Sequence, residues 1–550
     1  MSPSLASLFV ALAALLSSTA YGQNATSTYS EPNVPTGVPV EGNYGGPLRP
    51  QVHFSPPQGF MNDPNGMFVD ADGVYHLYYQ YNPTAIVAGN QHWGHATSRD
   101  LYTWENQAIA IFPSGPTEGI FSGSAVVDVN NTSGFFPNQT NGVVAIYTLN
   151  TPERETQDIA YSIDGGYTFT KYANNPVIDS NSTQFRDPKV LWYPGTERWI
   201  MVVSYAQEFA IGIFSSPNLI DWTHESNFTR HGLLGLQYEC PNLVEVPVAG
   251  SSDYDTLFVL LISINPGGPL GGSISQYFPG TFNGTHFSAI DGAARIANFA
   301  KDDYAAQFFS GIPGSSNHIS IGWASNWQYT NVLPTDREGF RSVMTGPREH
   351  YLKELPKVGL SLVSAPYNAT AAVDQELAYN ATLGNGTLFV DYGAVESRAL
   401  YWEANVTGLT DSSSLQGSVN FTFSSSTTGE YVSGGTWVST GDVWLDRGHS
   451  TAWSNPFFTD KFSATGLYDG NGTWRISGIV DRSIIEVYLN GGEHVATSVF
   501  FPAEPLDWVT ISVKGLNESA QASVGVWALQ AAWLDQADVN GTVAGNVTSS

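Results

Sequence analysis

Residues 50–345 consist of short extended runs broken by Gly, Pro, Asn and Asp, and no long segment there has the 3.6-residue apolar period of a helix. Such runs, bounded by turn residues, are typical of β-strands. One pattern recurs, starting at Ser98, Ser162 and Ser216: a strand ends in Ser, a turn follows, and an aromatic residue begins the next strand. The repeats lie roughly 60 residues apart, enough for four strands and their turns, so the region predicts a β-propeller of about five blades.

The last third of the chain is also rich in strand-like sequence. Apolar and polar residues alternate at 418–423 and 484–489, which predicts strands with one buried face. A chain of 550 residues is long enough for two domains with full cores. We therefore expect an all-β protein with a propeller at 48–345, a connector with a charged stretch at 346–366 and a β-sandwich at 367–535.

Both ends of the chain differ from these domains. An apolar stretch leads to Ala20-Tyr21-Gly22, a small-x-small sequence, and predicts a secretory signal peptide at 1–22. Residues 23–47 are rich in Ser, Thr, Pro and Gly and are expected to be disordered. The tail at 536–550 is rich in Gly, Ala and Ser and is expected to be mobile. After the signal peptide, no apolar run reaches the about 18 residues needed to span a membrane.

Charge and glycosylation signals narrow the partners. The formal net charge is −28, from 49 acidic and 21 basic residues, which argues against binding to nucleic acids or anionic membranes. Sixteen Asn-x-Ser/Thr sequons run from Asn24 to Asn546. We therefore expect N-glycans on a secreted protein, extracellular or associated with a cell wall. The single cysteine, Cys240, excludes an intramolecular disulfide, and the oligomeric state stays open, with a homo-oligomer among the alternatives.

Three short blocks place a carboxylate one or two residues before a proline, next to apolar, strand-like sequence. Proline restricts the residue before it to extended backbone, which suits a carboxylate that must be aimed from a strand end. In the first block, Asn65-Gly66 predicts a hairpin turn. Taken alone, Asp63-Pro64-Asn65-Gly66 would favour an ordinary turn, because Asp and Asn are common turn formers. The blocks are Phe60-Met61-Asn62-Asp63-Pro64-Asn65-Gly66, Phe185-Arg186-Asp187-Pro188-Lys189 and Gln237-Tyr238-Glu239-Cys240-Pro241.

Together, the three blocks resemble in order and spacing the signature motifs of glycoside hydrolase family 32. The resemblance covers residues 50–535 and includes segments at 80–83, 93–98, 121–124, 263–267 and 324–327. It implies a five-bladed β-propeller followed by a β-sandwich. It also implies a retaining β-fructofuranosidase that hydrolyses sucrose and related terminal β-D-fructofuranosides, such as fructo-oligosaccharides. Some fructosyl transfer is expected, with no metal and no cofactor.

The resemblance implies a role for each carboxylate. Asp63 is the expected nucleophile, Glu239 the general acid and base, and Asp187 the group that binds fructose hydroxyls and stabilises the transition state. Arg186 is expected to keep Asp187 ionised by its fixed charge. Cys240 is expected to tune the surroundings of Glu239, and a cysteine nucleophile is disfavoured because no His/Asn partner motif accompanies it. The residues expected to bind the fructosyl group are Phe60, Asn62, Gln80, Phe121, Ser122, Arg186 and Trp327.

Some of these residues also have a structural interpretation. Phe121 and Trp327 would suit ordinary core packing. His92 and His95 lack carboxylate or cysteine neighbours at ligand spacing, so hydrogen-bonding strand histidines are expected rather than a metal pair. The segment at 70–73 begins like a calcium loop but lacks the later ligands, which favours a hairpin turn.

One position departs from the family pattern. Many members have Trp where this chain has Ala88, before Gly89-Asn90. A methyl group in place of an indole would open the pocket wall to a second sugar. The sequence therefore leaves two alternatives: a fructosyltransferase that makes fructo-oligosaccharides or levan-type fructans, and an exo-inulinase or levanase. A catalytically silent fructan-binding protein is disfavoured because all three carboxylates are present.

Overall fold

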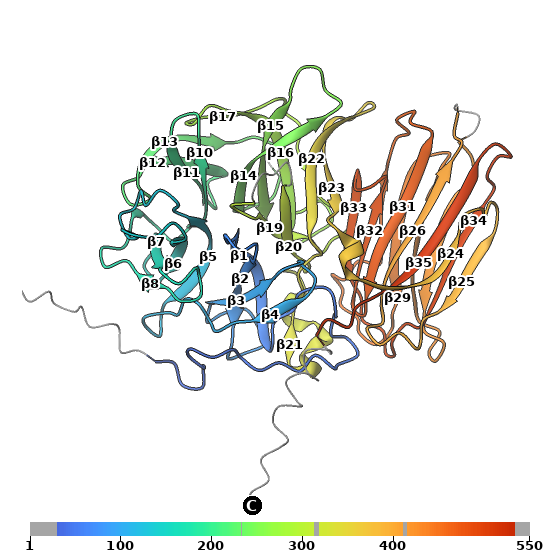
Figure 1. Cartoon of the computed structure of the whole chain (residues 1–550), viewed down its shortest axis with the longest axis horizontal. Helices are drawn as coiled ribbons and strands as arrows, with labels where there is room; N and C mark the ends of the chain where they lie inside the picture. The colour runs from blue at the N-terminus through green and yellow to red at the C-terminus, as the bar shows by residue number, and fades with distance from the viewer. Residues whose placement is uncertain (1–29, 233, 313–317, 411–414, 534–550) are drawn as a thin grey trace, which may run out of the picture.

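The computed structural model describes residues 30–232, 234–312, 318–410 and 415–533. Within these ranges nearly all regular structure is strand, with three short 3-10 helices, η1 (Thr330–Val332), η2 (Pro334–Glu338) and η3 (Ala369–Ala372). Two bodies lie side by side: a ring of small sheets from the first two thirds of the chain, and a layered pair of sheets from the last third (Figure 1). The expected all-β architecture is confirmed. The expected signal peptide and C-terminal tail lie outside the described residues.

The ring consists of five successive groups of four antiparallel strands among the described residues. The first group is β1 (Gly59–Val69), β2 (Tyr75–Asn82), β3 (His92–Ser98) and β4 (Trp104–Asn106); the second is β5 (Gly119–Val127), β6 (Val143–Asn150), β7 (Glu155–Ser162) and β8 (Thr170–Lys171); the third is β10 (Phe185–Tyr193), β11 (Arg198–Tyr205), β12 (Ala210–Ser216) and β13 (Thr223–Thr229); the fourth is β14 (Tyr238–Ala249), β15 (Thr256–Ile264), β16 (Ile274–Phe282) and β17 (Phe287–Ala289); the fifth is β19 (Tyr304–Phe308), β20 (Ile319–Trp323), β22 (Arg348–Leu355) and β23 (Gly359–Pro366).

Shorter strands tie these groups together. A parallel pairing of β14 with β22 joins the fourth group to the fifth. The two-residue β21 (Phe340–Arg341) adds to β1 in parallel. The other short strands, β9 (Ile178–Ser182) and β18 (Arg295–Ile296), pair with β7 and β16. Backbone pairing between strands therefore links the fourth group to the fifth, whereas the second and third groups form separate sheets.

The recurring Ser-turn-aromatic pattern connects the third and fourth strands of the first three groups. After β3, the Ser98 hydroxyl accepts the Leu101 N–H at 2.8 Å, and Leu101 has a positive φ of 71°. After β12, Leu219 adopts the same conformation, with φ 65°. Trp104 and Trp222 each donate an indole N–H to the carbonyl of that leucine. The sequence repeat therefore corresponds to the same hydrogen-bonded turn after β3 and after β12.

The last third of the described chain is a sandwich of two six-stranded sheets, as expected. Both sheets direct large apolar side chains inward, and the Trp402 and Phe421 rings meet across the core with centroids 4.5 Å apart. The first sheet runs β24 (Val373–Asn380), β35 (Gln521–Leu529), β26 (Ala399–Thr407), β31 (Thr473–Asp481), β32 (Ile484–Leu489) and β33 (His494–Val499); the second runs β25 (Thr387–Asp391), β34 (Trp508–Lys514), β27 (Ser418–Ser424), β28 (Tyr431–Trp437), β29 (Asp442–His449) and β30 (Lys461–Thr465).

Two local expectations differ from the structure. Asn65-Gly66 is not a hairpin turn: β1 runs through it, and the register with β2 shifts between Asn65 and Phe68. A Cβ on Gly66 would lie 2.6 Å from the Tyr78 ring, so this glycine allows close packing inside the sheet. The segment 346–366, expected as a connector, forms the hairpin of β22 and β23 in the fifth group.

The described part of the N-terminal segment, residues 30–47, differs from the expected disorder. Val34 and Val40 are buried against the propeller. The Tyr44 ring stacks on Trp533 with centroids 4.0 Å apart, and Glu31 contacts His92 at 3.2 Å. Scattered apolar residues thus anchor a segment whose overall composition is polar. Over the described ranges, no helix has the length and apolar character needed to cross a membrane.

Candidate active site

The first strand of each propeller group has a register shift of the β-bulge kind near its beginning. Such a bulge re-aims side chains and interrupts the ladder beside a site. The backbone is also unusual here: Asp187, Cys240 and Ala305 have positive φ values of 68°, 47° and 52°. The shifts fall between Met61 and Pro64 in β1, Ile120 and Gly123 in β5, Arg186 and Lys189 in β10, Glu239 and Asn242 in β14, and Tyr304 and Gln307 in β19.

Asp63 lies at the bulge of β1 and is only 7% exposed. One of its oxygens, Oδ2, accepts the Ser122 hydroxyl at 2.7 Å and the Cys240 thiol at 3.3 Å. The other, Oδ1, has no hydrogen-bond partner among the described residues. Burial raises the pKa of Asp63, and the negative charge of Glu239 adds to the rise. The site thus leaves one carboxylate oxygen free to meet a substrate.

Asp187 lies at the bulge of β10 and is 6% exposed. Its Oδ2 accepts the backbone N–H of Cys240 at 2.9 Å and the Cys240 thiol at 3.5 Å. Burial, followed by the charge of Glu239, raises the pKa of Asp187 to about 8. Cys240 therefore bridges two of the three predicted carboxylates. Burial also raises the pKa of the Cys240 thiol well above its usual value, which disfavours a thiolate nucleophile.

The charge of Arg186 lowers the pKa of Asp187, as expected, but burial and the charge of Glu239 outweigh it. The hydrogen bonds of Arg186 go to other residues. The Arg186 Nε donates to Glu239 Oε1 at 3.1 Å, and Nη1 donates to the two oxygens of Glu155 at 2.9 and 3.0 Å. Its Nη2 donates to Gln184 Oε1 at 3.1 Å. The β-bulge after Arg186 and the positive φ of Asp187 interrupt the regular strand here, and the Arg186 guanidinium lies toward the neighbouring groups of the ring.

Glu239 is the second residue of β14 and the most exposed of the three predicted carboxylates, with 15% of its side chain accessible. Its Oε1 accepts hydrogen bonds from the Arg186 Nε and, at 3.3 Å, from the Gln237 amide. Its Oε2 accepts the Tyr304 hydroxyl from β19. Four of the five inner strands thus supply Asp63, Asp187, Glu239 and Tyr304 to one cluster, and Ser122 completes it from β5.

Two of the predicted polar pocket residues surround Asp63. Ser122 contacts it directly, as described above, and Asn62 precedes it on β1 with 8% exposure. Gln80 has a different contact: it is 2% exposed and its amide donates to the Ile120 carbonyl at 2.9 Å. That bond ties β2 to β5 just before the bulge that carries Ser122.

Three predicted aromatic residues lie on inner or adjoining segments. The Phe60 ring is buried, with its centroid 6.5 Å from that of Trp327, and Trp327 packs on Trp323 at 4.9 Å. Phe121 is partly buried beside Ser122, and its carbonyl accepts the Trp93 indole at 3.0 Å. These aromatics brace the strands that carry the carboxylates.

The two histidines have ordinary partners. His92 Nδ1 faces the Asn90 carbonyl at 2.8 Å, and His95 Nε2 lies 3.1 Å from His76 Nδ1. In the parts of the chain that the structure covers, no three His, Cys, Asp or Glu side chains are arranged to hold a metal ion.

Two residues at the site were not predicted from the sequence. Glu155, the first residue of β7, is 3% exposed and lies against Arg186. Tyr304, the first residue of β19, lies against Glu239. The repeat offers a signal for Tyr304, because every propeller group needs a first strand and the fifth had no assigned residue. Glu155 has no such signal, since only the ring brings β7 beside β10.

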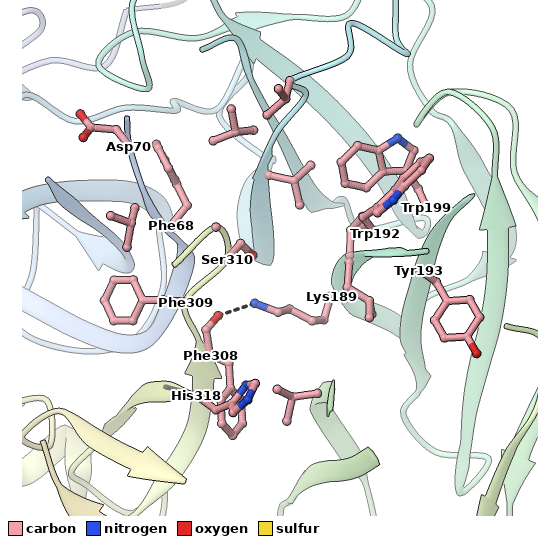
Figure 2. Close-up of a pocket in the computed structure, with 18 of the residues that line it drawn as sticks. Phe68, Asp70, Lys189, Trp192, Tyr193, Trp199, Phe308, Phe309, Ser310 and His318 are labelled. Carbon is pink, nitrogen blue, oxygen red and sulfur yellow. Dashed lines mark hydrogen bonds between the residues drawn. The ribbon is translucent and has the colours of Figure 1, made fainter. Parts of the chain in front are cut away.

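A large cavity of about 670 Å³ lies elsewhere, where the inner strands end (Figure 2). It is lined mainly by apolar side chains, including Phe68, Trp192 and Phe308, and by Lys189, whose ammonium donates to the Phe308 carbonyl at 2.6 Å. None of the three predicted carboxylates lines it. This cavity and the carboxylate cluster therefore lie at different places along the inner strands, and the cluster is the candidate site.

Comparisons with known proteins agree with this geometry. Residues 53–366 match the model of the glycosyl hydrolases family 32 N-terminal domain, and residues 368–528 match the family 32 C-terminal model. The chain is 41% identical to an invertase of Schizosaccharomyces pombe over 90% of this chain and 87% of that protein. It is 43% identical to an extracellular exo-inulinase of Meyerozyma guilliermondii, over 82% and 90% of the two chains.

Solved structures give the same picture. A fructofuranosidase from Schwanniomyces occidentalis in complex with fructose superposes with a TM-score of 0.80 at 39% identity, covering 89% of this chain and 99% of that one. An exo-inulinase from Aspergillus awamori superposes with a TM-score of 0.79 at 32% identity, covering 89% and 100% of the two chains.

Proposed function

Because this chain belongs to glycosyl hydrolase family 32, and is a β-fructofuranosidase, we propose that it hydrolyses sucrose by double displacement with Asp63 and Glu239 as the reacting pair. The observation that carries this assignment is the free Oδ1 of Asp63, in a cluster where hydrogen bonds to other side chains hold both oxygens of Glu239. One carboxylate is left open to attack, and the other is held in place to exchange a proton.

In the first step, Asp63 Oδ1 forms a bond to C2 of the fructosyl group as the glycosidic C2–O bond breaks. Glu239 gives its proton to the departing glucose oxygen. In the second step, Glu239 takes a proton from water while the water oxygen attacks C2, and the Asp63–C2 bond breaks. Two inversions at C2 give net retention, which NMR of the first-formed fructose anomer would detect.

The raised pKa values of Asp63 and Asp187 have a place in this scheme. Burial raises the pKa of Asp63, and it raises the pKa of Asp187 to about 8, so Asp187 is the carboxyl that keeps its proton near neutral pH. The oxocarbenium-like transition state brings positive charge to C2 and makes ionised neighbours favourable. Asp187 is then the group that stabilises this charge, more strongly in the transition state than in the empty enzyme.

A second activity, fructosyl transfer, is favoured by the environment of Ala88. The backbone N–H of Ala88 donates to Asn331 Oδ1 at 2.9 Å, and the partly buried methyl group packs against the core cluster that contains Phe60. A methyl group fills less volume than an indole, so this position would leave more room for an acceptor sugar. Exo-acting cleavage of fructans is the remaining alternative, since relatives include exo-inulinases and a Schwanniomyces occidentalis variant was solved with fructosylnystose.

The discriminating experiment is incubation with sucrose over a wide concentration range, with free glucose and free fructose measured separately. Hydrolysis releases the two in equal amounts. A deficit of fructose measures transfer. Failure to release glucose at any concentration would contradict the proposal, and faster turnover of inulin or levan than of sucrose would favour the exo-acting alternative.

We also propose that the protein is secreted and N-glycosylated. The sequons spread over the whole chain and the homologues that carry the word extracellular in their names support this. Digestion with an N-glycosidase and a mass shift of the secreted protein would test it.

A further inference from the structure

The guanidinium of Arg186 lies between two carboxylates. Its Nε donates a hydrogen bond to Glu239, and its Nη1 donates to both oxygens of Glu155. A backbone hydrogen bond also fixes Glu155, because its Oε2 accepts the Phe185 N–H at 2.7 Å. The Arg186 side chain is 10% exposed and that of Glu155 is 4% exposed, so water screens these charges weakly. A change of charge at Glu155 should therefore act on Glu239 through Arg186.

The other groups that face Glu239 come from several strands. Asp63 on β1, Asp187 on β10 and the Cys240 thiol on β14 add negative or neutral groups, and the Tyr304 hydroxyl on β19 donates to it. Arg186 is the one cation in direct contact with Glu239 among the described residues. How strongly Arg186 favours the ionised form of Glu239 therefore depends on how much of its charge is neutralised elsewhere.

We propose that Glu155 is a positioning residue that shares the charge of Arg186 and so keeps Glu239 able to hold the proton it must deliver as general acid. The inference rests on the proposed function, because it assigns Glu155 a task only if Glu239 is the acid. With both carboxylates present, one cation is divided between two anions. With Glu155 neutral, the full cation would act on Glu239 and favour loss of its proton.

The test is the pH profile of kcat/KM for sucrose. In Glu155→Gln the alkaline limb of the profile should move to lower pH by about one unit, because a nearby unneutralised cation favours the ionised acid. The acidic limb, which reports the nucleophile, should move much less. At pH 7 the variant should lose roughly tenfold in kcat/KM, and at pH 4 it should approach the wild type.

A second variant makes the opposite change. Gln184 accepts Arg186 Nη2 at 3.1 Å and is partly buried, so Gln184→Glu adds a carboxylate to the same guanidinium. The alkaline limb should then move to higher pH. Damage to the fold cannot produce shifts of opposite sign in two neighbouring variants, so this pair separates charge sharing from a purely structural role.

Two controls complete the design. Glu155→Asp keeps the negative charge and should restore the wild-type alkaline limb even if kcat falls. Asp158→Asn removes a different buried carboxyl of β7, bonded to Thr156 at 2.8 Å and not to Arg186, and should leave the limb in place.

An alkaline limb unchanged in both Glu155→Gln and Gln184→Glu, with active enzyme, would overturn the role of Glu155. A Glu155→Gln variant that does not fold leaves Gln184→Glu to decide the matter. Wild-type enzyme without activity on any fructofuranoside would instead refute the proposed function itself.

Discussion

Two clusters of buried carboxylates in this protein contain the same kinds of residue, but their pKa values shift in opposite directions. In the proposed catalytic cluster, burial raises the pKa values of Asp63 and Asp187. At the contact between the two domains, Glu486 and Asp481 are equally buried, yet the pKa of Glu486 falls to about 2 and that of Asp481 falls below its usual value. Because burial is similar in the two clusters, the hydrogen-bonding and charged partners of the carboxylates account for the opposite pKa shifts.

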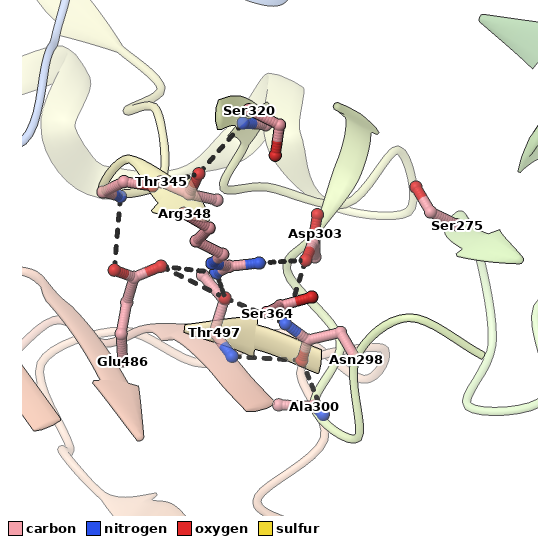
Figure 3. A network of polar contacts seen from close by, with 12 residues as sticks. Ser275, Asn298, Ala300, Asp303, Ser320, Thr345, Arg348, Ser364, Glu486 and Thr497 are labelled. Atoms are coloured by element: carbon pink, nitrogen blue, oxygen red, sulfur yellow. Dashed lines mark hydrogen bonds and ion pairs between the residues drawn. The ribbon is translucent and has the colours of Figure 1, made fainter. Parts of the chain in front are cut away.

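The interdomain cluster pairs each carboxylate with donors (Figure 3). Arg348 of β22 reaches Asp303 at 2.7 Å and also Glu486 of β32. Asp481 of β31 accepts the backbone N–H groups of 51–53, at 2.8 to 3.0 Å, and the His53 ring at 3.0 Å. These bonds lower the pKa values of Glu486 and Asp481 and raise that of His53 to about 9.

The catalytic cluster lacks that balance. Asp63, Asp187, Glu239 and Glu155 face one arginine among the described residues, and Asp63 keeps an oxygen unbonded. Buried charge that is matched holds two domains in one arrangement. Buried carboxyls without a matching cation have raised pKa values, and the positive charge that develops on a reacting sugar would favour their ionised forms. Four predictions test this contrast, in order of decreasing effect.

The largest effect is expected at the reacting pair. Asp63→Asn and Glu239→Gln should each lower kcat roughly 10⁴-fold or more without unfolding the protein, and the double variant should lose little more, because both serve one double displacement. Azide should partly rescue Glu239→Ala on a substrate with a good leaving group, measured by product release. Rescue of an Asp63 variant alone would reverse the assignment of the two roles.

The next effect is on stability. Arg348→Met leaves Asp303 buried without its cation and Glu486 with His53 alone, and it should cost about 3–5 kcal/mol, seen as a lower Tm in calorimetry, while kcat of the folded enzyme stays near wild type. The matched control is Arg154→Met, which breaks an exposed pair with Asp179 and should cost less than about 1 kcal/mol. Equal losses in the two variants would remove the distinction between matched buried charge and surface charge.

The two clusters should also respond to pH with opposite sign. Asp187 has its ordinary pKa of 3.8 in the unfolded chain and about 8 in the folded one, so it penalises folding increasingly as pH rises from about 4 to 8. Glu486 shifts from 4.5 to about 2, so its stabilisation is complete above about pH 4.5 and is lost as pH falls toward 2.

Asp187→Asn should therefore raise Tm at pH 7, by a few degrees, with a smaller gain near pH 4. Glu486→Gln should lower Tm at pH 7, with a smaller loss near pH 3. Melting curves of both variants between pH 3 and 8 check this. Shifts of the same sign in both variants would mean that burial alone governs these carboxyls.

The smallest effect is expected at Ala88. Ala88→Trp should fill the pocket wall, hinder an acceptor sugar and shift the product ratio toward hydrolysis at high sucrose by roughly two- to fivefold, with a smaller change in total cleavage. The ratio of free fructose to free glucose measures it. The same ratio in wild type and variant at several sucrose concentrations would make Ala88 neutral and leave transfer without its support.

Much of the architecture was predictable from local pattern. Alternating runs and the recurring Ser-turn-aromatic unit indicated strands in groups of four, and the structure uses that unit as the same closed turn after β3 and β12. Asn65-Gly66 shows where the pattern fails. Its residue types favour a hairpin turn, but the packing of Tyr78 and Trp93 over Gly66 keeps β1 continuous.

The sequence by itself determined the family, the all-β class and the three carboxylates, because those depend on residue types at short spacing. The tertiary structure decided which groups those carboxylates meet. Arg186 adjoins Asp187 in sequence, yet it hydrogen-bonds Glu239 and Glu155, because a β-bulge follows Arg186 and the ring brings β7 and β14 beside β10. Contacts between distant strands, and the balance of charge that they create, exist only once the propeller has closed.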